Sequence, residues 1–230
     1  MKKFNRREVL GMAAGVTVAC SGLLNGCKNK ENKMSTAKPK YQQYKNEDFY
    51  KADGSFDTAK AKQAYYEMME YFNYPIPDRL KGEDFWAVDF GLGRFTEVGM
   101  AGILWINNLE HNYMGHDIYL LAGQRIPEHG HDKTDKAESK KEGWLVRHGM
   151  IHTYSEGQPT PGADADIPEA EKKYWIAKTK NKLMPGEVDY LKVPATMHWM
   201  RAGDEGAIVT EFATFHDGDG LKFSTPGVSF

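Results

Sequence analysis

The sequence predicts an all-β fold, an antiparallel β-barrel or sandwich that is preceded by one amphipathic helix. Short apolar runs bounded by glycine, proline and asparagine follow one another along residues 85–215, as in strands joined by turns. Helical periodicity comes before them, over residues 56–73. The roughly 175 residues after position 55 are enough for one domain.

Residues 1–27 have the layout of an export signal, because a basic start is followed by small and apolar residues. This stretch is too short to span a bilayer stably. Asn5–Leu10, NRREVL, resembles a twin-arginine motif, and Leu24–Cys27, LNGC, resembles a lipoprotein cleavage box. We therefore predict an exported chain, lipid-anchored at the cell envelope in the periplasm or at the cell surface. Cys27 is the acylated residue or, alternatively, Cys20; a cytoplasmic protein with an apolar N-terminal helix is the competing interpretation.

Residues 28–55 are polar with little apolar periodicity, which predicts a tether between the anchor and a domain of residues 56–230. Both cysteines lie in the leader, so stability must come from the core and not from a disulfide. The first 27 residues carry four basic side chains and one acidic side chain, so removing them changes the net charge from −2 to −5. This acidic balance argues against nucleic acid as a partner.

The predicted helix spans Phe56–Asn73, with Ser55 as a possible cap and Pro75 after its end. The predicted strands are, in chain order, FWAVDF, GMAGILWINN, DIYLLAG, WLVRHGMIHTY, VDYLKVP and GAIVTEFATF. The Pro/Gly/Asp-rich segment from Ser155 to Lys173 is an excursion between strands. DFGLGRF lacks the third glycine and the following helix of a dinucleotide-binding loop, so it indicates a turn.

Four residues are candidate metal ligands. His129 and His131 share one face if their segment is a strand, and Glu142 follows them after the charged loop DKTDKAESKK. His198 begins a later strand. Neutral imidazoles and a carboxylate suit a divalent first-row metal. Each element is weak alone, and Glu138 competes with Glu142, but the whole array has the two-motif pattern of the cupins.

Glu211 is the other chemically informative residue. It is a lone acid on a strand face otherwise formed by Ala207, Val209, Ala213 and Phe215. A buried carboxylate with neither function nor partner is costly. Two interpretations remain open: an acid–base group whose pKa burial raises towards neutrality, or a structural ion pair with an arginine such as Arg147.

Residues 84–226 resemble the small cupin D-lyxose isomerases. The motifs that carry the resemblance are DFGLG, GQ…PEHGH, KKEGW…VRHG, EGQPTPG, PGE…VPATMHW and EGAIVTEFAT. In that family a His-His-Glu-His set binds a divalent ion, usually manganese, and the glutamate lies eleven residues after the second histidine. His131 and Glu142 have this spacing, which favours Glu142 over Glu138.

The resemblance implies a cupin fold, a double-stranded β-helix or jelly-roll barrel, and conversion of D-lyxose to D-xylulose or of D-mannose to D-fructose. It also favours Glu211 as the base that moves a proton in the enediol. Lys140 and Arg147 are candidate donors to the sugar, although both also fit solvated positions, and Arg147 needs a strand bulge to reach the site.

Three positions depart from the family pattern: Arg147 stands in LVRH where relatives carry Arg-x-Arg, His116 replaces a lysine, and Lys222 replaces an aspartate. These differences concern the sugar more than the metal. Two other functions remain open, a cupin dioxygenase with the same ligands and a non-catalytic sugar- or metal-binding lipoprotein. By analogy with the fold, a homodimer is plausible.

Overall fold

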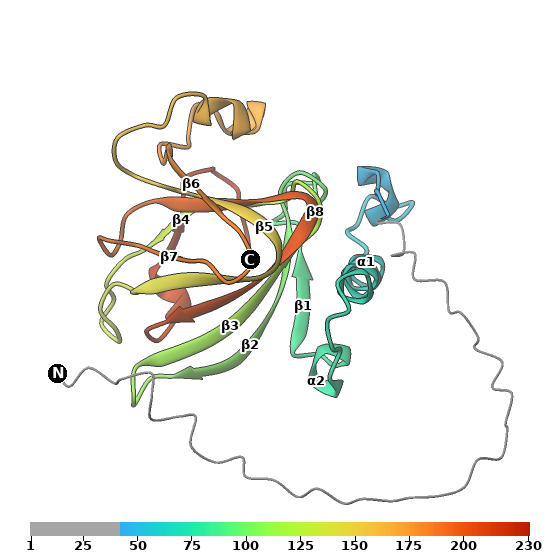
Figure 1. Ribbon diagram of the computed structural model, residues 1–230, viewed down its shortest axis with the longest axis horizontal. Coiled ribbons are helices and arrows are strands. Elements are labelled where there is room, and N and C mark those ends of the chain that lie inside the picture. Colours follow the sequence, from blue (N-terminus) through green and yellow to red (C-terminus); the bar gives the residue numbers. More distant parts are fainter. Residues whose placement is uncertain (1–41) are drawn as a thin grey trace, which may run out of the picture. The chain divides into compact units, whose positions relative to one another are not determined.

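A computed structural model describes residues 42–230, and in them nine strands form one strongly curled antiparallel sheet with helices against one side (Figure 1). The predicted export signal, and the tether as far as residue 41, lie outside the described residues. Within residues 42–230, no helix is long and apolar enough to cross a membrane.

Two α-helices precede the sheet, α1 over Thr58–Tyr71 and α2 over Asp78–Lys81. Helix α1 starts after Asp57, whose side chain accepts a hydrogen bond from the backbone N–H of Lys60, so the predicted Ser55 cap is wrong. The apolar face of α1 packs on the outer side of the sheet beside β1 (Figure 1). The buried residues of this face are Ala61, Ala64, Tyr65, Met68 and Met69.

The packed domain begins before the boundary predicted at residue 55. A 3₁₀ helix over Asn46–Phe49 lies beside α1, and the Phe49 side chain is fully buried, with its ring 4.7 Å from that of Phe95. The predicted tether is therefore too long at its C-terminal end. The error arose because one buried aromatic residue in a polar stretch produces no periodic pattern.

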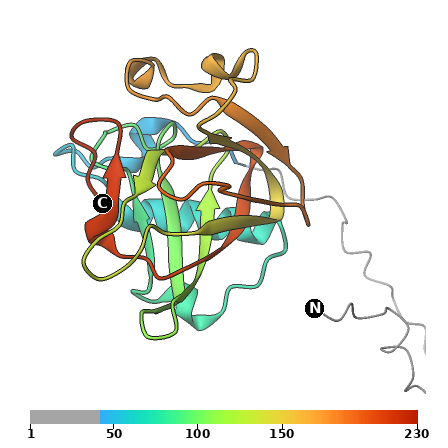
Figure 2. The same cartoon turned by 90° about the vertical axis from the view of Figure 1, so that its left-hand side faces the viewer.

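The strand bounds are β1 Phe85–Val88, β2 Met100–Asn108, β3 Tyr113–Leu120, β4 Arg125–His131, β5 Glu142–Ser155, β6 Thr179–Leu183, β7 Val188–Tyr190, β8 His198–Ala213 and β9 Leu221–Phe223. The sheet runs in the order β1-β2-β3-β8-β4-β9, and β5 pairs with β6, β7 and β8. The predicted excursion contains two short 3₁₀ helices, Ala163–Asp166 and Glu169–Glu171, and lies at one end of the barrel (Figures 1 and 2).

Strand β8 closes the barrel because it pairs with different strands along its length. Its first residues pair with β4, residues 207–213 pair with β3, and β5 accompanies both parts. Two irregularities in the β5–β8 ladder, one of them at Gly149, let β5 follow the bend of β8. Because the two ends of β8 pair with different strands while β5 runs along both, β3, β4 and β5 surround a common interior.

The register places the functional side chains in rows across that interior. His116 on β3, Glu211 on β8 and Trp144 on β5 are cross-strand neighbours. His129 on β4 pairs with His198 on β8. The next inward row along β3, β8 and β5 is Ile118, Val209 and Val146, all buried. The polar residues therefore lie directly over an apolar core, on strands that fix their positions.

Candidate active site

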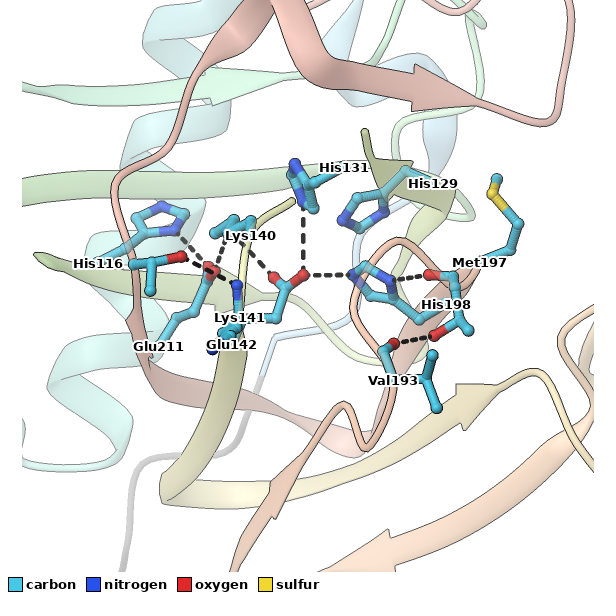
Figure 3. A network of polar contacts seen from close by, with 12 residues as sticks. His116, His129, His131, Lys140, Lys141, Glu142, Val193, Met197, His198 and Glu211 are labelled. Carbon is cyan, nitrogen blue, oxygen red and sulfur yellow. Dashed lines mark hydrogen bonds and ion pairs between the residues drawn. The ribbon is translucent and has the colours of Figure 1, made fainter. Parts of the chain in front are cut away.

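A cavity of about 170 Å³ opens inside the barrel, and eight charged or imidazole side chains line it. These are His116, His129, His131, Lys140, Glu142, His198, Glu211 and His216. They come from β3, β4, β5 and β8 and from the loops next to β5 and β8. Figure 3 shows the carboxylate of Glu142 between the histidines on one side and Lys140 and Glu211 on the other.

The structure brings the four predicted metal ligands together. The possible ligand atoms of His129, His131 and His198 all lie within 4.8 Å of one another. Glu142 Oε1 lies 3.6 Å from His131 Nε2 and 3.4 Å from His198 Nε2. The competing carboxylate, Glu138, is exposed and pairs with a lysine of its own loop.

Two of the imidazoles are oriented by backbone carbonyls. His129 Nδ1 lies 2.9 Å from the Pro127 oxygen, and His198 Nδ1 lies 3.0 Å from the Thr196 oxygen. A carbonyl only accepts, so each Nδ1 carries the proton and each Nε2 keeps a free lone pair. Burial lowers the pKa of His129 to about 4 and also lowers the pKa of His131 and His198. All three rings are therefore neutral near pH 7, the form in which imidazole binds a metal.

Three atoms at the centre of this group lack hydrogen bonds within the part of the chain that is described. His131 Nε2, His198 Nε2 and Glu142 Oε1 are buried without a partner there, although buried polar atoms nearly always have one. Burial also raises the pKa of Glu142 to about 8, against the attraction of Lys140. A divalent cation among these three atoms would satisfy all of them and keep the carboxylate ionised, so the residues fit a metal.

Glu211 lies in the same cavity with two partners. Lys140 donates to Glu211 Oε1 and, over 3.0 Å, to Glu142 Oε2, while His116 Nδ1 lies 3.0 Å from Glu211 Oε2. Burial alone would raise the pKa of Glu211, but Lys140 and His116 outweigh burial and hold it well below the usual value. The expectation of a raised pKa is therefore wrong, because the carboxylate is desolvated together with its donors.

The structure places Lys140 inside the cavity and Arg147 outside it. Lys140 is buried at the centre of the site, so the interpretation of its charged run as solvated is wrong at this residue. Arg147 is exposed outside the cavity, and its Nε donates to Thr210 Oγ1 over 2.9 Å. The ladder irregularity between Val146 and His148 does not turn Arg147 inward. The alternative Arg147–Glu211 ion pair is therefore wrong, and Arg147 is not among the residues that line the cavity.

Sequence reasoning missed several residues of the cavity. His216 follows β8 in a loop and lies against His131, with 5.3 Å between ring centres. No spacing in the sequence identifies His216 as a cavity residue, because it lies in a loop whose position depends on the fold and not on a strand period. Six aromatic residues line the cavity, and four of them lie in segments remote in sequence from the predicted ligands. These four are Trp86, Phe90, Phe223 and Phe230.

The chain is similar in sequence to two sugar isomerases. It is 31% identical over 167 residues to a D-lyxose/D-mannose isomerase of Thermosediminibacter oceani, covering 73% of this chain and 90% of that protein. It is 34% identical over 169 residues to a D-lyxose ketol-isomerase of a Thermofilum species, covering 74% and 92%. No protein-family model matches.

Solved structures agree on the fold. The L-ribose isomerase of Acinetobacter sp. DL28 in complex with L-ribose superposes with a TM-score of 0.60 at 12% identity, covering 79% of this chain and 95% of that one. The L-ribose isomerase of Cellulomonas parahominis gives 0.59 at the same identity. The predicted all-β, cupin-type double-stranded β-helix with a preceding helix is confirmed.

Proposed function

Because the chain belongs to the family of D-lyxose ketol-isomerases, we propose that it is a metal-dependent aldose–ketose isomerase acting on a free sugar. D-Lyxose and D-xylulose are the first proposed pair, and D-mannose and D-fructose the second. One observation carries the proposal: Glu211, buried between Lys140 and His116, lies in the same cavity as four residues suited to a divalent cation. Membership in this family argues against the dioxygenase and the binding lipoprotein.

His129, His131, Glu142 and His198 would hold the metal, which is manganese in this proposal. When bound, the ion supplies positive charge that stabilises negative charge on the substrate oxygens. The Nδ1 hydrogen bonds of His129 and His198 orient those two rings before any ion arrives. The donor set of three nitrogens and one oxygen suits several first-row ions, so manganese rests on the family resemblance.

Glu211 moves the proton in this mechanism. Its low pKa keeps it deprotonated at neutral pH, so it is ready to take the proton from C2 of the aldose. The C2–H electron pair becomes the C1=C2 bond of an enediol while the C1=O π pair moves onto the oxygen, which takes a proton from the Lys140 ammonium; Lys140 recovers a proton when the C2 hydroxyl gives up its own. Glu211 then returns its proton to C1 as the C2 hydroxyl loses its own, which leaves the ketose. The same carboxylate serves both carbons because they are adjacent.

Lys140 and His116 support this step in different ways. The Lys140 ammonium bridges Glu211 and Glu142, so it fixes the base relative to the metal ligands and has further N–H groups for a substrate oxygen. His116 holds the other oxygen of Glu211. The base therefore has a single orientation, which is what positioned proton transfer requires.

The test uses the full-length chain, stripped of metal and reloaded with manganese, in D₂O with D-lyxose or D-mannose. We expect C2 deuterium exchange and ketose formation by NMR, under argon as well as in air. Metal-loaded protein that exchanges neither sugar would refute the isomerase, and oxygen consumption with iron would favour the dioxygenase.

We also propose that the chain is exported and lipid-anchored, on the basis of the basic, apolar and LNGC segments of residues 1–27. Mass spectrometry of protein from the membrane fraction should find acylation at Cys27. Cys27→Ala should then leave the protein unacylated, whereas acylation that persists would point to Cys20. The homodimer also stays a prediction, which light scattering on the purified chain tests.

A further inference from the structure

The cavity has a wall of aromatic rings beside its polar site. Trp86 and Phe90 come from β1 and the turn after it, and Phe223 and Phe230 come from β9 and the C-terminal segment. Ring centres are 4.8 Å apart for Trp86 and Phe230, 6.1 Å for Phe230 and Phe90, and 5.9 Å for Phe90 and Phe223. The four rings thus form one continuous surface.

This aromatic wall touches the polar site at both of its ends. Trp86 is stacked on His116 with 5.7 Å between ring centres, and Phe223 lies 6.0 Å from His129. His116 holds the proposed base, and His129 is a proposed metal ligand. A sugar whose C1 and C2 are at these groups must therefore extend its remaining carbons along the rings or over the apolar floor at Ile118.

The backbone at Phe90 indicates that its ring has a role. Phe90 and Gly91 have φ of 57° and 69° in a tight turn, in which the Leu92 N–H donates to the Asp89 carbonyl oxygen over 3.1 Å. Such turns favour asparagine or glycine, and an aromatic residue there is strained. The Phe90 ring is nevertheless 1% exposed and faces the cavity. Strain that is kept at a cavity wall points to a binding role.

The polar side chains that line the cavity gather around the candidate metal ligands and Glu211. Four of them suit the cation, and Lys140, Glu211, His116 and His216 lie beside these. Apart from the indole N–H of Trp86, the aromatic wall has no hydrogen-bonding side chain. A hydroxyl group on the far end of the sugar would therefore find no acceptor side chain among the four rings, whereas a methyl group would pack well on them.

We infer that the preferred substrate ends in a methyl group: a 6-deoxyaldose with the D-lyxose configuration at C2, C3 and C4 and the D configuration at C5, which is 6-deoxy-D-mannose. The inference rests on the proposed isomerase function and names its substrate class. D-Lyxose has the same three centres but leaves the far end of the cavity unfilled. D-Mannose fills it with a hydroxymethyl group whose O–H finds no acceptor side chain on the aromatic wall.

The first test compares kcat/KM of the full-length, manganese-loaded chain for 6-deoxy-D-mannose, D-mannose and D-lyxose. We expect the deoxy sugar to exceed D-mannose by about 100-fold, the discrimination that a hydrophobic pocket exerts against one added hydroxyl. Equal or better turnover of D-mannose would overturn the inference and leave the isomerase standing. Turnover of none of the three sugars would instead refute the proposed function.

A binding measurement separates the two proposals further. The sugar alcohols 6-deoxy-D-mannitol and D-mannitol cannot isomerise, so calorimetric titration reports their affinities alone. If 6-deoxy-D-mannitol binds about tenfold or more tightly than D-mannitol, the far end of the cavity prefers a methyl group, and this holds even for protein without catalytic activity. Equal affinities would contradict it, whatever the turnover.

Two matched variants locate the effect. Phe230→Ser places a hydroxyl on the aromatic wall at a residue that is 68% exposed, so folding should tolerate it. Phe212→Ser makes the same change at a 53% exposed residue that does not line the cavity, on the other face of β8 from Glu211. We expect the deoxymannose-to-mannose ratio to fall about tenfold in the first variant and to stay unchanged in the second. An unchanged ratio in both variants would remove the aromatic wall from the explanation.

Discussion

The protonation state of Glu211 depends on its two hydrogen-bond donors. Lys140 and His116 each hold one carboxylate oxygen, so the group stays ionised although it is buried. An ionised base is available at neutral pH without any cost for deprotonation. It is also a weaker base than a carboxylate whose pKa is near 7, so its positioning must account for much of its effect.

Glu211→Gln should remove the base while preserving its shape. We expect kcat/KM to fall by roughly 10²–10⁴-fold, the usual contribution of general acid–base catalysis. Bound manganese should stay near the wild-type amount, because Glu211 is not one of the proposed ligands. Metal analysis and C2 deuterium exchange measure the two effects, and Glu138→Gln on the exposed loop is the matched control. A variant that loses its metal or its fold would show instead that the residue is structural.

His116 should act as a positioning residue through Glu211, and two variants separate this role from packing. Asparagine can donate to Glu211 as the His116 Nδ1 does, whereas leucine cannot. His116 lowers the pKa of Glu211, so its loss should raise that pKa. Because Glu211 must be deprotonated, activity in His116→Leu should then fall off at a higher pH on the acid side of the kcat/KM profile, and His116→Asn should shift less. Identical profiles for wild type and leucine variant would contradict this role.

The residues that could be predicted are those whose strand period fixes their direction. His129, His131 and Glu211 were assigned to inward faces by parity, and each lines the cavity. The charged neighbours of Lys140 favour a solvated position, but its ammonium is buried between two carboxylates, Glu142 two residues along the chain and Glu211 on β8. For Arg147, strand parity predicts the outward position correctly, whereas both the family motif and the alternative ion pair with Glu211 required an inward one.

At the element scale, β5 and β8 carry most of the geometry, and their bend depends on glycine. Gly149 has φ of 73°, and a Cβ there would overlap the carbonyl oxygen of Gly206 on the adjoining strand. The close approach of two backbones at this point needs a residue without a side chain. Through it, β5 remains paired with β8 from Glu142 to Ser155.

Gly149→Ala should therefore lower the free energy of unfolding by more than the strain of its positive φ alone. Gly162 is the matched control, because its φ is 82° and a Cβ there would meet nothing within 4 Å. We expect Gly162→Ala to lower the free energy of unfolding by about 1 kcal/mol and Gly149→Ala by about 3 kcal/mol or more. Urea unfolding measures the difference between the two variants. Equal losses of unfolding free energy in the two variants would mean that β5 and β8 can separate at Gly149 without destabilising the fold.

The elements themselves differ in how well sequence patterns predict them. The apolar run GMAGILWINN predicted β2, and the helical stripe predicted α1 to within two residues at each end. Strand β6, TKNKL, has no apolar run and pairs only at one edge of β5, so its backbone hydrogen bonds specify it. Periodicity detects an element that buries a face, and it fails where a strand is held mainly by its ladder.

At the scale of the whole molecule, the candidate metal ligands connect three strands that are separate in sequence. His129 and His131 lie on β4, Glu142 on β5 and His198 on β8. Barrel closure could not be predicted from the sequence, because it depends on how the two ends of β8 choose different partners. A cation held by these four residues would tie the closed barrel together, and the unfolded chain would not offer them in one place.

Manganese should accordingly stabilise the fold. A ligand that binds only the folded state adds about 2.7 kcal/mol at a concentration of 100 times its Kd. For a domain of this size that corresponds to a rise in Tm of about 5–11 °C between metal-free and metal-loaded protein. His198→Ala should abolish the rise, since it removes the ligand that joins β8 to β4 and β5. His152→Ala, at a half-buried histidine that does not line the cavity, should keep it. Thermal unfolding with and without chelator decides the matter: a rise that survives in His198→Ala would place the ion elsewhere, and no rise in the wild type would mean that the four residues do not hold it.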